Sequence, residues 1–206
     1  MQMISLQDSI DELYRIAVIE KRTTSTLRLS HLADLCVQEL DLRGIAGAEK
    51  EILVPGIGRD KKWDVAWKRD GKIRLGISLK SLLSNIAGTV PNRADDLMGE
   101  MANVQLLSPE IVTGYVMVFN TDPQFEKRGD GQRWVDVFRS YVEQLSGRKA
   151  PAWAAGMVEA AVVVEVDFSS GPVLASPQTL DPFFDRLADS LKQRNPGILT
   201  GNHTEE

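Results

Sequence analysis

Residues 63–80 read WDVAWKRDGKIRLGISLK, and this stretch decides the fold class. Both ends of it are rich in β-branched, aromatic and alternating apolar residues, which predicts strands over 63–68 and 72–80. Between them, Arg69, Asp70 and Gly71 form a turn signal of the kind that joins antiparallel strands. The odd-numbered residues of the second strand are apolar and would share one face. The sequence therefore predicts a hairpin with one buried face.

Alternating helix and strand signals surround this hairpin. A capping box at Ser5 predicts a helix at the start of the chain. Further helices are expected over about 25–40, 93–107, 132–145 and 181–194, and further strands over 51–54, 112–120 and 158–168. This order predicts an α/β fold, with one mixed β-sheet core flanked by helices. We expect a single domain over 1–195 and a disordered tail over 196–206.

Composition narrows the classes of function. The chain has 206 residues, 43% apolar residues and a net charge of −5, which excludes a polybasic protein that binds nucleic acid through bulk charge. Cys36 is the sole cysteine, so no intrachain disulfide can form and a reducing compartment is expected. No secretory signal or membrane-spanning segment is recognisable, so a cytoplasmic protein without a membrane partner is predicted.

One region departs from the acidic average. Between Arg59 and Lys80 the chain carries eight cationic and three anionic side chains. This local excess of positive charge has two interpretations: a solvated hairpin, or a surface that contacts phosphates.

Three residues of the hairpin carry possible chemistry. With a three-residue loop over 69–71, Asp64 falls opposite Gly76 and shares a face with Ser78 and Lys80. A slip of one residue would set Asp64 against Ile77 and destroy the arrangement. The carboxylate and the ammonium would form either an ordinary ion pair or a metal-dependent phosphodiester site. In such a site, Asp64 and the Leu79 carbonyl would hold Mg²⁺ through hard oxygen ligands.

These residues resemble a known family. The strings Lys62-Trp63-Asp64-Val65 and Leu75-Gly76-Ile77-Ser78-Leu79-Lys80-Ser81 are similar to the motif of the PD-(D/E)XK nuclease superfamily, and within it to type II restriction endonucleases. The run over 89–100 resembles the helix start that follows the catalytic strand in enzymes of the XhoI/PaeR7I type. The resemblance implies a restriction-endonuclease-like fold and a Mg²⁺-dependent DNA endonuclease, with Mn²⁺ as an alternative ion.

The chain departs from the family pattern at Ser78, where Glu or Asp is usual. Some members of the superfamily with a Ser-x-Lys strand recover the missing carboxylate from the following helix. We expect Glu100 to be that ligand, so that the resemblance implies Asp64, Ser78, Lys80 and Glu100 as the catalytic set. The acids that remain open as alternatives are Asp95, Asp96, Glu39 and Glu51.

Five residues are expected to contact DNA: Arg59, Lys61, Lys62, Asn92 and Arg93. Asn92 has a second interpretation as the N-cap of the helix over 93–107. Cleavage of both strands implies a homodimer, for which the apolar strand over 158–168 and the helix over 181–194 are the expected interface. The resemblance also implies a companion methyltransferase. The alternative function is a non-catalytic DNA-binding or assembly module that has kept a nuclease-like fold.

Overall fold

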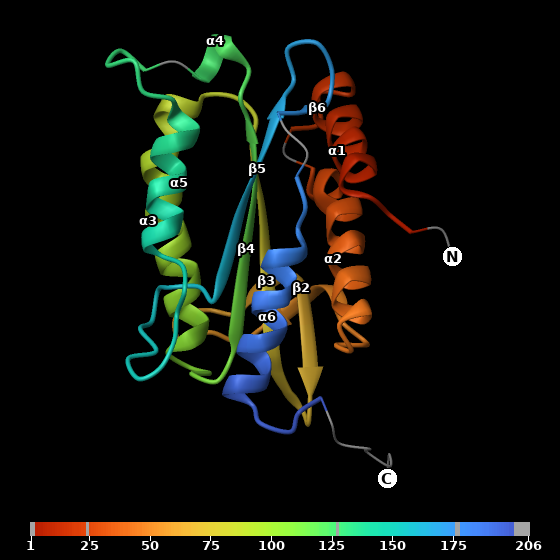
Figure 1. The fold of residues 1–206 in the computed structure, drawn as a ribbon, viewed down its shortest axis with the longest axis vertical. Coiled ribbons are helices and arrows are strands. Elements are labelled where there is room, and N and C mark those ends of the chain that lie inside the picture. The colour runs from red at the N-terminus through yellow and green to blue at the C-terminus, as the bar shows by residue number, and fades with distance from the viewer. Residues whose placement is uncertain (1–2, 24, 127, 176–177, 200–206) are drawn as a thin grey trace.

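A computed structural model describes residues 3–23, 25–126, 128–175 and 178–199 (Figure 1). The described residues form one six-stranded sheet in which the strands follow their order in the sequence. The strands are β1 (Glu49–Val54), β2 (Lys61–Arg69), β3 (Lys72–Leu82), β4 (Val112–Asn120), β5 (Ala160–Asp167) and β6 (Val173–Leu174). Neighbouring strands are antiparallel from β1 to β3, parallel from β3 to β5, and antiparallel again at β6. The predicted α/β class with a mixed sheet is confirmed.

Helices cover both faces of the sheet (Figure 1). They are α1 (Leu6–Tyr14), the π-helix η1 (Arg15–Ile19), the 3-10 helix η2 (Thr26–Leu29), α2 (Ser30–Leu42), α3 (Ile86–Gln105), α4 (Pro123–Glu126), α5 (Trp134–Gln144) and α6 (Asp181–Arg194). Helices α1, α2 and α6 pack on one face, and α3 and α5 pack on the other. The sheet therefore separates two apolar cores.

Strand β4 lies at the centre of the sheet and is buried along its whole length. A strand covered on both faces needs apolar side chains in both directions, which explains the continuous run VTGYVMVFN. Helix α6 approaches this strand closely at Gly114, where a Cβ atom would lie 2.9 Å from the Phe183 ring.

The β2–β3 hairpin corrects the predicted register. Its turn has two residues rather than three, because Asp70 and Gly71 both take positive φ angles and Arg69 pairs with Lys72. This turn alone would set Asp64 against Ile77, but a bulge adds one residue to β3 near Lys68. Beyond the bulge Val65 pairs with Ile77, so Asp64 comes beside Ser78 instead of Gly76. The partner of Asp64 is thus two residues away from the predicted one, and a shift of two residues leaves the Asp64 side chain on the predicted face of the sheet.

The apolar surface expected to form a dimer interface is used within the chain. Strand β5 lies between β4 and β6, and the apolar face of α6, including Phe184 and Leu187, is buried in the core. The expectation of a free apolar face on α6 is therefore wrong, whereas β6 pairs with β5 at Val166 and Asp167 and the part played by the rest of β5 in a dimer stays a prediction. Neither hydrophobicity nor amphipathic pattern distinguishes a buried core face from an interface.

The C-terminal end of the described chain packs against the core. Ile198 is buried and Leu199 packs against the core, while residues 200–206 lie outside the described residues. Among the described residues, no helix is long and apolar enough to cross a bilayer.

A buried ion pair ties the start of β4 to the loop that precedes β5. The Arg148 guanidinium donates to Glu159 at 3.0 Å and to the Ile111 carbonyl at 3.1 Å. The second carboxylate oxygen of Glu159 accepts from the backbone N–H and the hydroxyl of Thr113. Both charged side chains are almost completely excluded from solvent. Each buried charge is therefore paired and hydrogen-bonded, as an interior ion pair requires.

The variant Arg148→Met is expected to lose about 3–5 kcal/mol of unfolding free energy, because it leaves the Glu159 carboxylate buried without its counter-ion. The matched control is Arg139→Met, which removes a partly exposed arginine that pairs with Asp136 and Glu165 and should cost less than about 1 kcal/mol. Urea unfolding monitored by circular dichroism measures both. Equal losses in the two variants would contradict the structural role of Arg148.

Candidate active site

The site begins where β2 and β3 separate. The pairing of the two strands ends at Val65 and Ile77, and Asp64 directly precedes Val65 on β2. One Asp64 carboxylate oxygen accepts a hydrogen bond from the Leu79 N–H at 2.7 Å. In an extended strand the N–H and C=O of one residue point to the same side. The Leu79 carbonyl is therefore directed towards the Asp64 side of β3, as the expected metal ligand would have to be.

Helix α3 brings Glu100 to the same place. Glu100 is buried, and its carboxylate accepts a hydrogen bond from the Ser78 hydroxyl at 3.0 Å. The Lys61 ammonium lies 3.1 Å from the other carboxylate oxygen. A glutamate far along the chain from the hairpin is thus held by a residue of β2 and a residue of β3.

Lys80 stands between the two acids. Its ammonium donates to the Ser78 hydroxyl at 2.6 Å and lies 3.5 Å from Glu100 and 3.9 Å from Asp64. An ammonium can only donate, so Ser78 accepts from Lys80 and directs its own proton to Glu100. The structure therefore brings Asp64, Ser78, Lys80 and Glu100 into one connected cluster.

The two carboxyl groups are perturbed in opposite directions. Burial raises the pKa of Asp64, and the negative charges of Glu100 and Glu51 raise it further, against the opposing effect of Lys80. Burial alone would also raise the pKa of Glu100, but Lys80, Lys61 and the Ser78 hydrogen bond outweigh it and lower the pKa. Glu100 is thus the more strongly ionised acid. Paired acids with divergent pKa values are typical of catalytic sites.

The donor set fits one hard divalent cation. Asp64, Glu100 and the Leu79 carbonyl supply three oxygen donors, and Mg²⁺ commonly completes its six ligands with water and substrate. Within the described residues there is no group of three or more His, Cys, Asp or Glu side chains arranged to hold a metal. An ion here would therefore depend on two carboxylates and on displacement of the Lys80 ammonium from between them.

A hollow of about 560 Å³ opens beside this cluster. Three of the predicted DNA contacts line it, namely Arg59, Lys61 and Arg93, together with Lys80 and Glu100. The other two predicted contacts, Lys62 and Asn92, are exposed and lie outside its lining. Of the eight cations between Arg59 and Lys80, three (Arg59, Lys61 and Lys80) line this hollow, and Arg93 adds a fourth cation from α3.

The N-cap interpretation of Asn92 is wrong. Helix α3 begins at Ile86, and Pro91 lies inside it, so Asn92 is an internal, exposed helix residue. A residue that precedes proline usually avoids helical geometry, which is why the sequence placed the start after Pro91. Burial of Ile86 and Val90 against the core stabilises the additional turns. Asp95 and Asp96 consequently lie beyond the first turn.

The alternative acids have other surroundings. Asp96 pairs with Arg93 at 2.7 Å, and Asp95 is exposed at the hollow. Glu39 pairs with Arg43, which in turn links α2 to α6. Glu51 has a positive φ angle of 58° and lines a small hollow together with Asp64. Of the five acids considered, Glu100 is the one that contacts Ser78 and Lys80.

Asn103 is a site residue that the sequence analysis missed. Its side-chain oxygen accepts from the Gly58 N–H at 2.9 Å and the Arg59 N–H at 3.3 Å, and its amide donates to the Arg59 carbonyl. The loop can approach because Gly56 has no side chain, since a Cβ there would lie 2.0 Å from the Asn103 amide. Asn103 lies one turn after Glu100 on α3. The only available signal was this spacing from Glu100.

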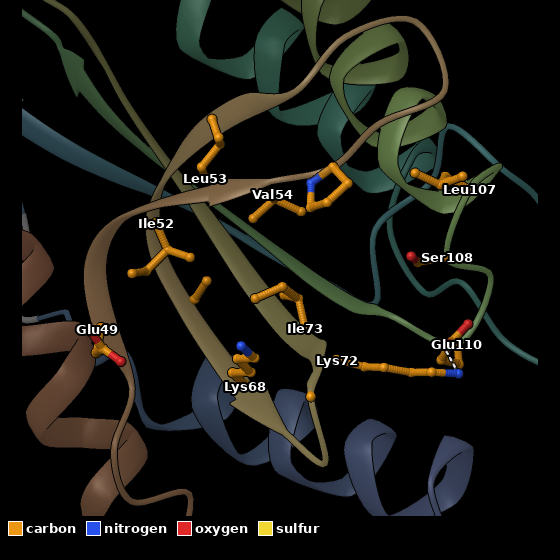
Figure 2. Close-up of a pocket in the computed structure, with 13 residues that line it drawn as sticks. Glu49, Ile52, Leu53, Val54, Lys68, Lys72, Ile73, Leu107, Ser108 and Glu110 are labelled. Atoms are coloured by element: carbon orange, nitrogen blue, oxygen red, sulfur yellow. Dashed lines mark ion pairs between the residues drawn. The ribbon is translucent and has the colours of Figure 1, made fainter.

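Another hollow, of about 580 Å³, lies between the hairpin and the segment that follows α3 (Figure 2). Leu53 and Ile73 line it from the sheet, and Leu107 lines it from the other side. Glu49 and Glu110 are its two acids, and Glu110 pairs with Lys72 and Arg74. None of the predicted site residues lines this hollow.

Comparisons with solved structures include a distant likeness. A comparison with protein-family models finds no match, and neither does one with curated proteins. Among solved structures, the small subunit of the heterodimeric restriction endonuclease R.BspD6I is similar to this chain with a TM-score of 0.35 and 8% sequence identity. The match covers 94% of this chain and 100% of that subunit.

The pKa shift of Glu100 predicts a pH-dependent stability. Because the pKa is lower in the folded protein than in the unfolded chain, ionised Glu100 stabilises the fold above the ordinary carboxyl value of about 4.3. This contribution is lost as the pH falls through the lower, folded-state pKa. The unfolding free energies of wild type and Glu100→Gln, measured in urea with EDTA, should therefore differ most above about pH 5, and this difference should shrink as the pH falls through the lowered, folded-state pKa of Glu100.

Asp64→Asn is the matched comparison with the opposite sign. Because the pKa of Asp64 is raised in the folded state, the wild type should lose stability relative to Asp64→Asn as the pH rises through the Asp64 titration. Parallel pH profiles for the two variants would contradict the opposite electrostatic surroundings of the two acids.

Proposed function

We propose that this protein is a metal-dependent DNA endonuclease of the restriction type. The observation that carries the proposal is the Lys80 ammonium between the Asp64 and Glu100 carboxylates. Two acids that can hold a metal ion and an adjacent lysine suit phosphodiester hydrolysis, because the metal ion and the ammonium would stabilise the negative charge that grows on the phosphate in the transition state. The four cations that line the hollow beside three acids support a polyanionic substrate.

Each residue of the cluster has a distinct role in this proposal. Asp64, Glu100 and the Leu79 carbonyl would hold Mg²⁺, or alternatively Mn²⁺, which when bound supplies an activated water and a counter-charge for the phosphate. Lys80 would orient the attacking water and donate to a phosphate oxygen. Ser78 would fix the positions of the Lys80 and Glu100 side chains relative to each other through its two hydrogen bonds.

The surrounding cations would position the duplex. Arg59, Lys61, Lys62 and Arg93 would contact backbone phosphates, and exposed Asn92 could reach a phosphate or a base edge. Two copies of the site would be needed to cut both strands, so a two-fold dimer belongs to the proposal. A companion methyltransferase and a cytoplasmic location belong to it as well.

Cleavage of plasmid and phage DNA with Mg²⁺ or Mn²⁺ tests the function. Asp64→Ala and Lys80→Ala should each lower the cleavage rate by at least about 100-fold, because each removes a group that stabilises the transition state. The controls are Asp189→Ala, an exposed acid on α6, and Lys68→Ala, an exposed lysine on the same hairpin. Cleavage that persists in both site variants would overturn the assignment.

A non-catalytic DNA-binding or assembly module is the second candidate. The observation that favours it is Ser78, a buried hydroxyl where the superfamily usually has a carboxylate. In that case the ion pairs of Glu100 with Lys61 and Lys80 would be purely structural.

Calorimetry separates the two candidates. If the site holds a metal, millimolar Mg²⁺ or Ca²⁺ should bind in the presence of DNA. Glu100→Gln should then weaken binding by at least about tenfold, because one of the two carboxylate ligands loses its charge. The control Glu110→Gln changes an acid that pairs with Lys72 and Arg74 and should leave the affinity unchanged. Absence of metal binding by the wild type would favour the non-catalytic module.

A further inference from the structure

The loop that joins β1 to β2, residues 55–60, is fastened to α3 by Asn103. The side-chain oxygen of Asn103 accepts from the N–H groups of Gly58 at 2.9 Å and Arg59 at 3.3 Å, and its amide nitrogen donates to the Arg59 carbonyl at 2.9 Å. The backbone carbonyl of Asn103 accepts a fourth bond, from the Ile57 N–H at 2.8 Å. One residue of α3 therefore binds three consecutive residues of the loop.

Two glycines allow this close contact. A Cβ atom on Gly56 would lie 2.0 Å from the Asn103 side-chain nitrogen and 2.6 Å from the Arg59 carbonyl oxygen. A Cβ atom on Gly58 would lie 3.3 Å from the Asn103 side-chain oxygen. A side chain at position 56 would therefore force the loop away from α3, because atoms at such separations overlap.

The residue that follows the loop is attached to the same helix. Lys61 begins β2, and its ammonium lies 3.1 Å from the Glu100 carboxylate. Glu100 and Asn103 are three residues apart on α3, so their side chains leave the same face of the helix. The loop and the start of β2 are thus held at two points about one helical turn apart, and Arg59 belongs to the first of them.

The side chain of Arg59 stays available although its backbone is fixed. Arg59 is exposed, and in the described part of the chain neither a hydrogen bond nor an ion pair involves its guanidinium. The other three cations that line the hollow beside the candidate active site each pair with an acid, namely Lys61, Lys80 and Arg93. Arg59 is therefore the cation of this hollow whose charge is least balanced by the described chain.

We propose that Asn103 is a positioning residue: by holding residues 55–60 on α3, it presents the Arg59 guanidinium to a backbone phosphate of the nucleic-acid substrate, at the hollow that Lys80 also lines. The planar donors of a guanidinium match phosphate oxygens. An arginine whose backbone is already ordered loses less conformational freedom on binding, so the contact contributes more affinity. The inference rests on the proposed function and adds to it a residue that acts through Arg59.

The test is the binding of a fluorescently labelled DNA duplex in Ca²⁺, followed by fluorescence anisotropy over a series of salt concentrations. Arg59→Gln should weaken binding about tenfold at about 0.1 M salt and reduce the slope of log K against log salt by about one, because one phosphate contact is lost. Asn103→Ala should weaken binding about fivefold, because the loop must then be ordered on binding. Added to Arg59→Gln, Asn103→Ala should cost at most about 1.5-fold more, because its effect passes through the arginine.

Gly56→Ala is a second way to separate the loop from α3, and it leaves both Asn103 and Arg59 in the chain. Its Cβ would collide with the Asn103 amide, so it should also weaken binding, and only while Arg59 is present. The matched control is Gly129→Ala, because a Cβ on this exposed loop glycine would meet no atom within 4 Å. The control should keep the affinity of the wild type.

Gln38→Ala is the control for a general loss of stability. The Gln38 amide holds Ile4 on α2 by one accepted and one donated hydrogen bond, and Gln38 does not line the hollow. It should leave DNA binding unchanged. Thermal unfolding of each variant shows whether the protein is folded. If Asn103→Ala does not fold, Gly56→Ala with and without Arg59→Gln decides in the same way.

The outcomes distinguish this inference from the proposed function. A wild type that binds the duplex while folded Asn103→Ala keeps the same affinity overturns the positioning role alone. Additive losses in the variant that combines Asn103→Ala with Arg59→Gln also overturn it, because Asn103 would then act independently of the arginine. A wild type that binds no duplex overturns both proposals.

Discussion

The hydrogen bond from the Leu79 N–H to Asp64 is the interaction on which the candidate site depends. It forms where β2 and β3 separate, so that a carboxylate takes the place of a strand partner. The bulge near Lys68 makes this possible, because without it the two-residue turn would bring Asp64 against Ile77. One extra residue in β3 therefore decides whether the acid and Lys80 meet.

The cluster is held together by a balance of charge. Two carboxylates at close quarters in a partly buried site repel each other, and the Lys80 ammonium between them offsets this repulsion. The second ammonium, Lys61, strengthens the ionisation of Glu100. Ser78 accepts from one charged group and donates to the other, which a carboxylate at that position could not do. The serine thus suits a site whose second acid comes from α3.

Cations from three parts of the chain lie around this cluster. Arg59, Lys61 and Arg93 line the hollow, and Asn103 fixes the loop that carries Arg59 to the helix that carries Glu100. A protein with a net charge of −5 can in this way offer a local surface for a polyanion, because electrostatic attraction is decided at short range in salt.

The sequence by itself determined the α/β class, most strand positions, the hairpin and the candidacy of Asp64 and Lys80, because alternation and residue chemistry are local properties. The candidacy of Glu100 came from the resemblance to a nuclease family. The sequence pattern placed the start of α3 at residue 93 instead of Ile86, and it missed α4, β6 and Asn103. Only the tertiary structure decided the bulge, the contact of Glu100 with Ser78, and the use of α6 as core instead of interface. These features depend on which distant segments pack together, and packing of segments far apart in the chain leaves no periodic pattern in the sequence.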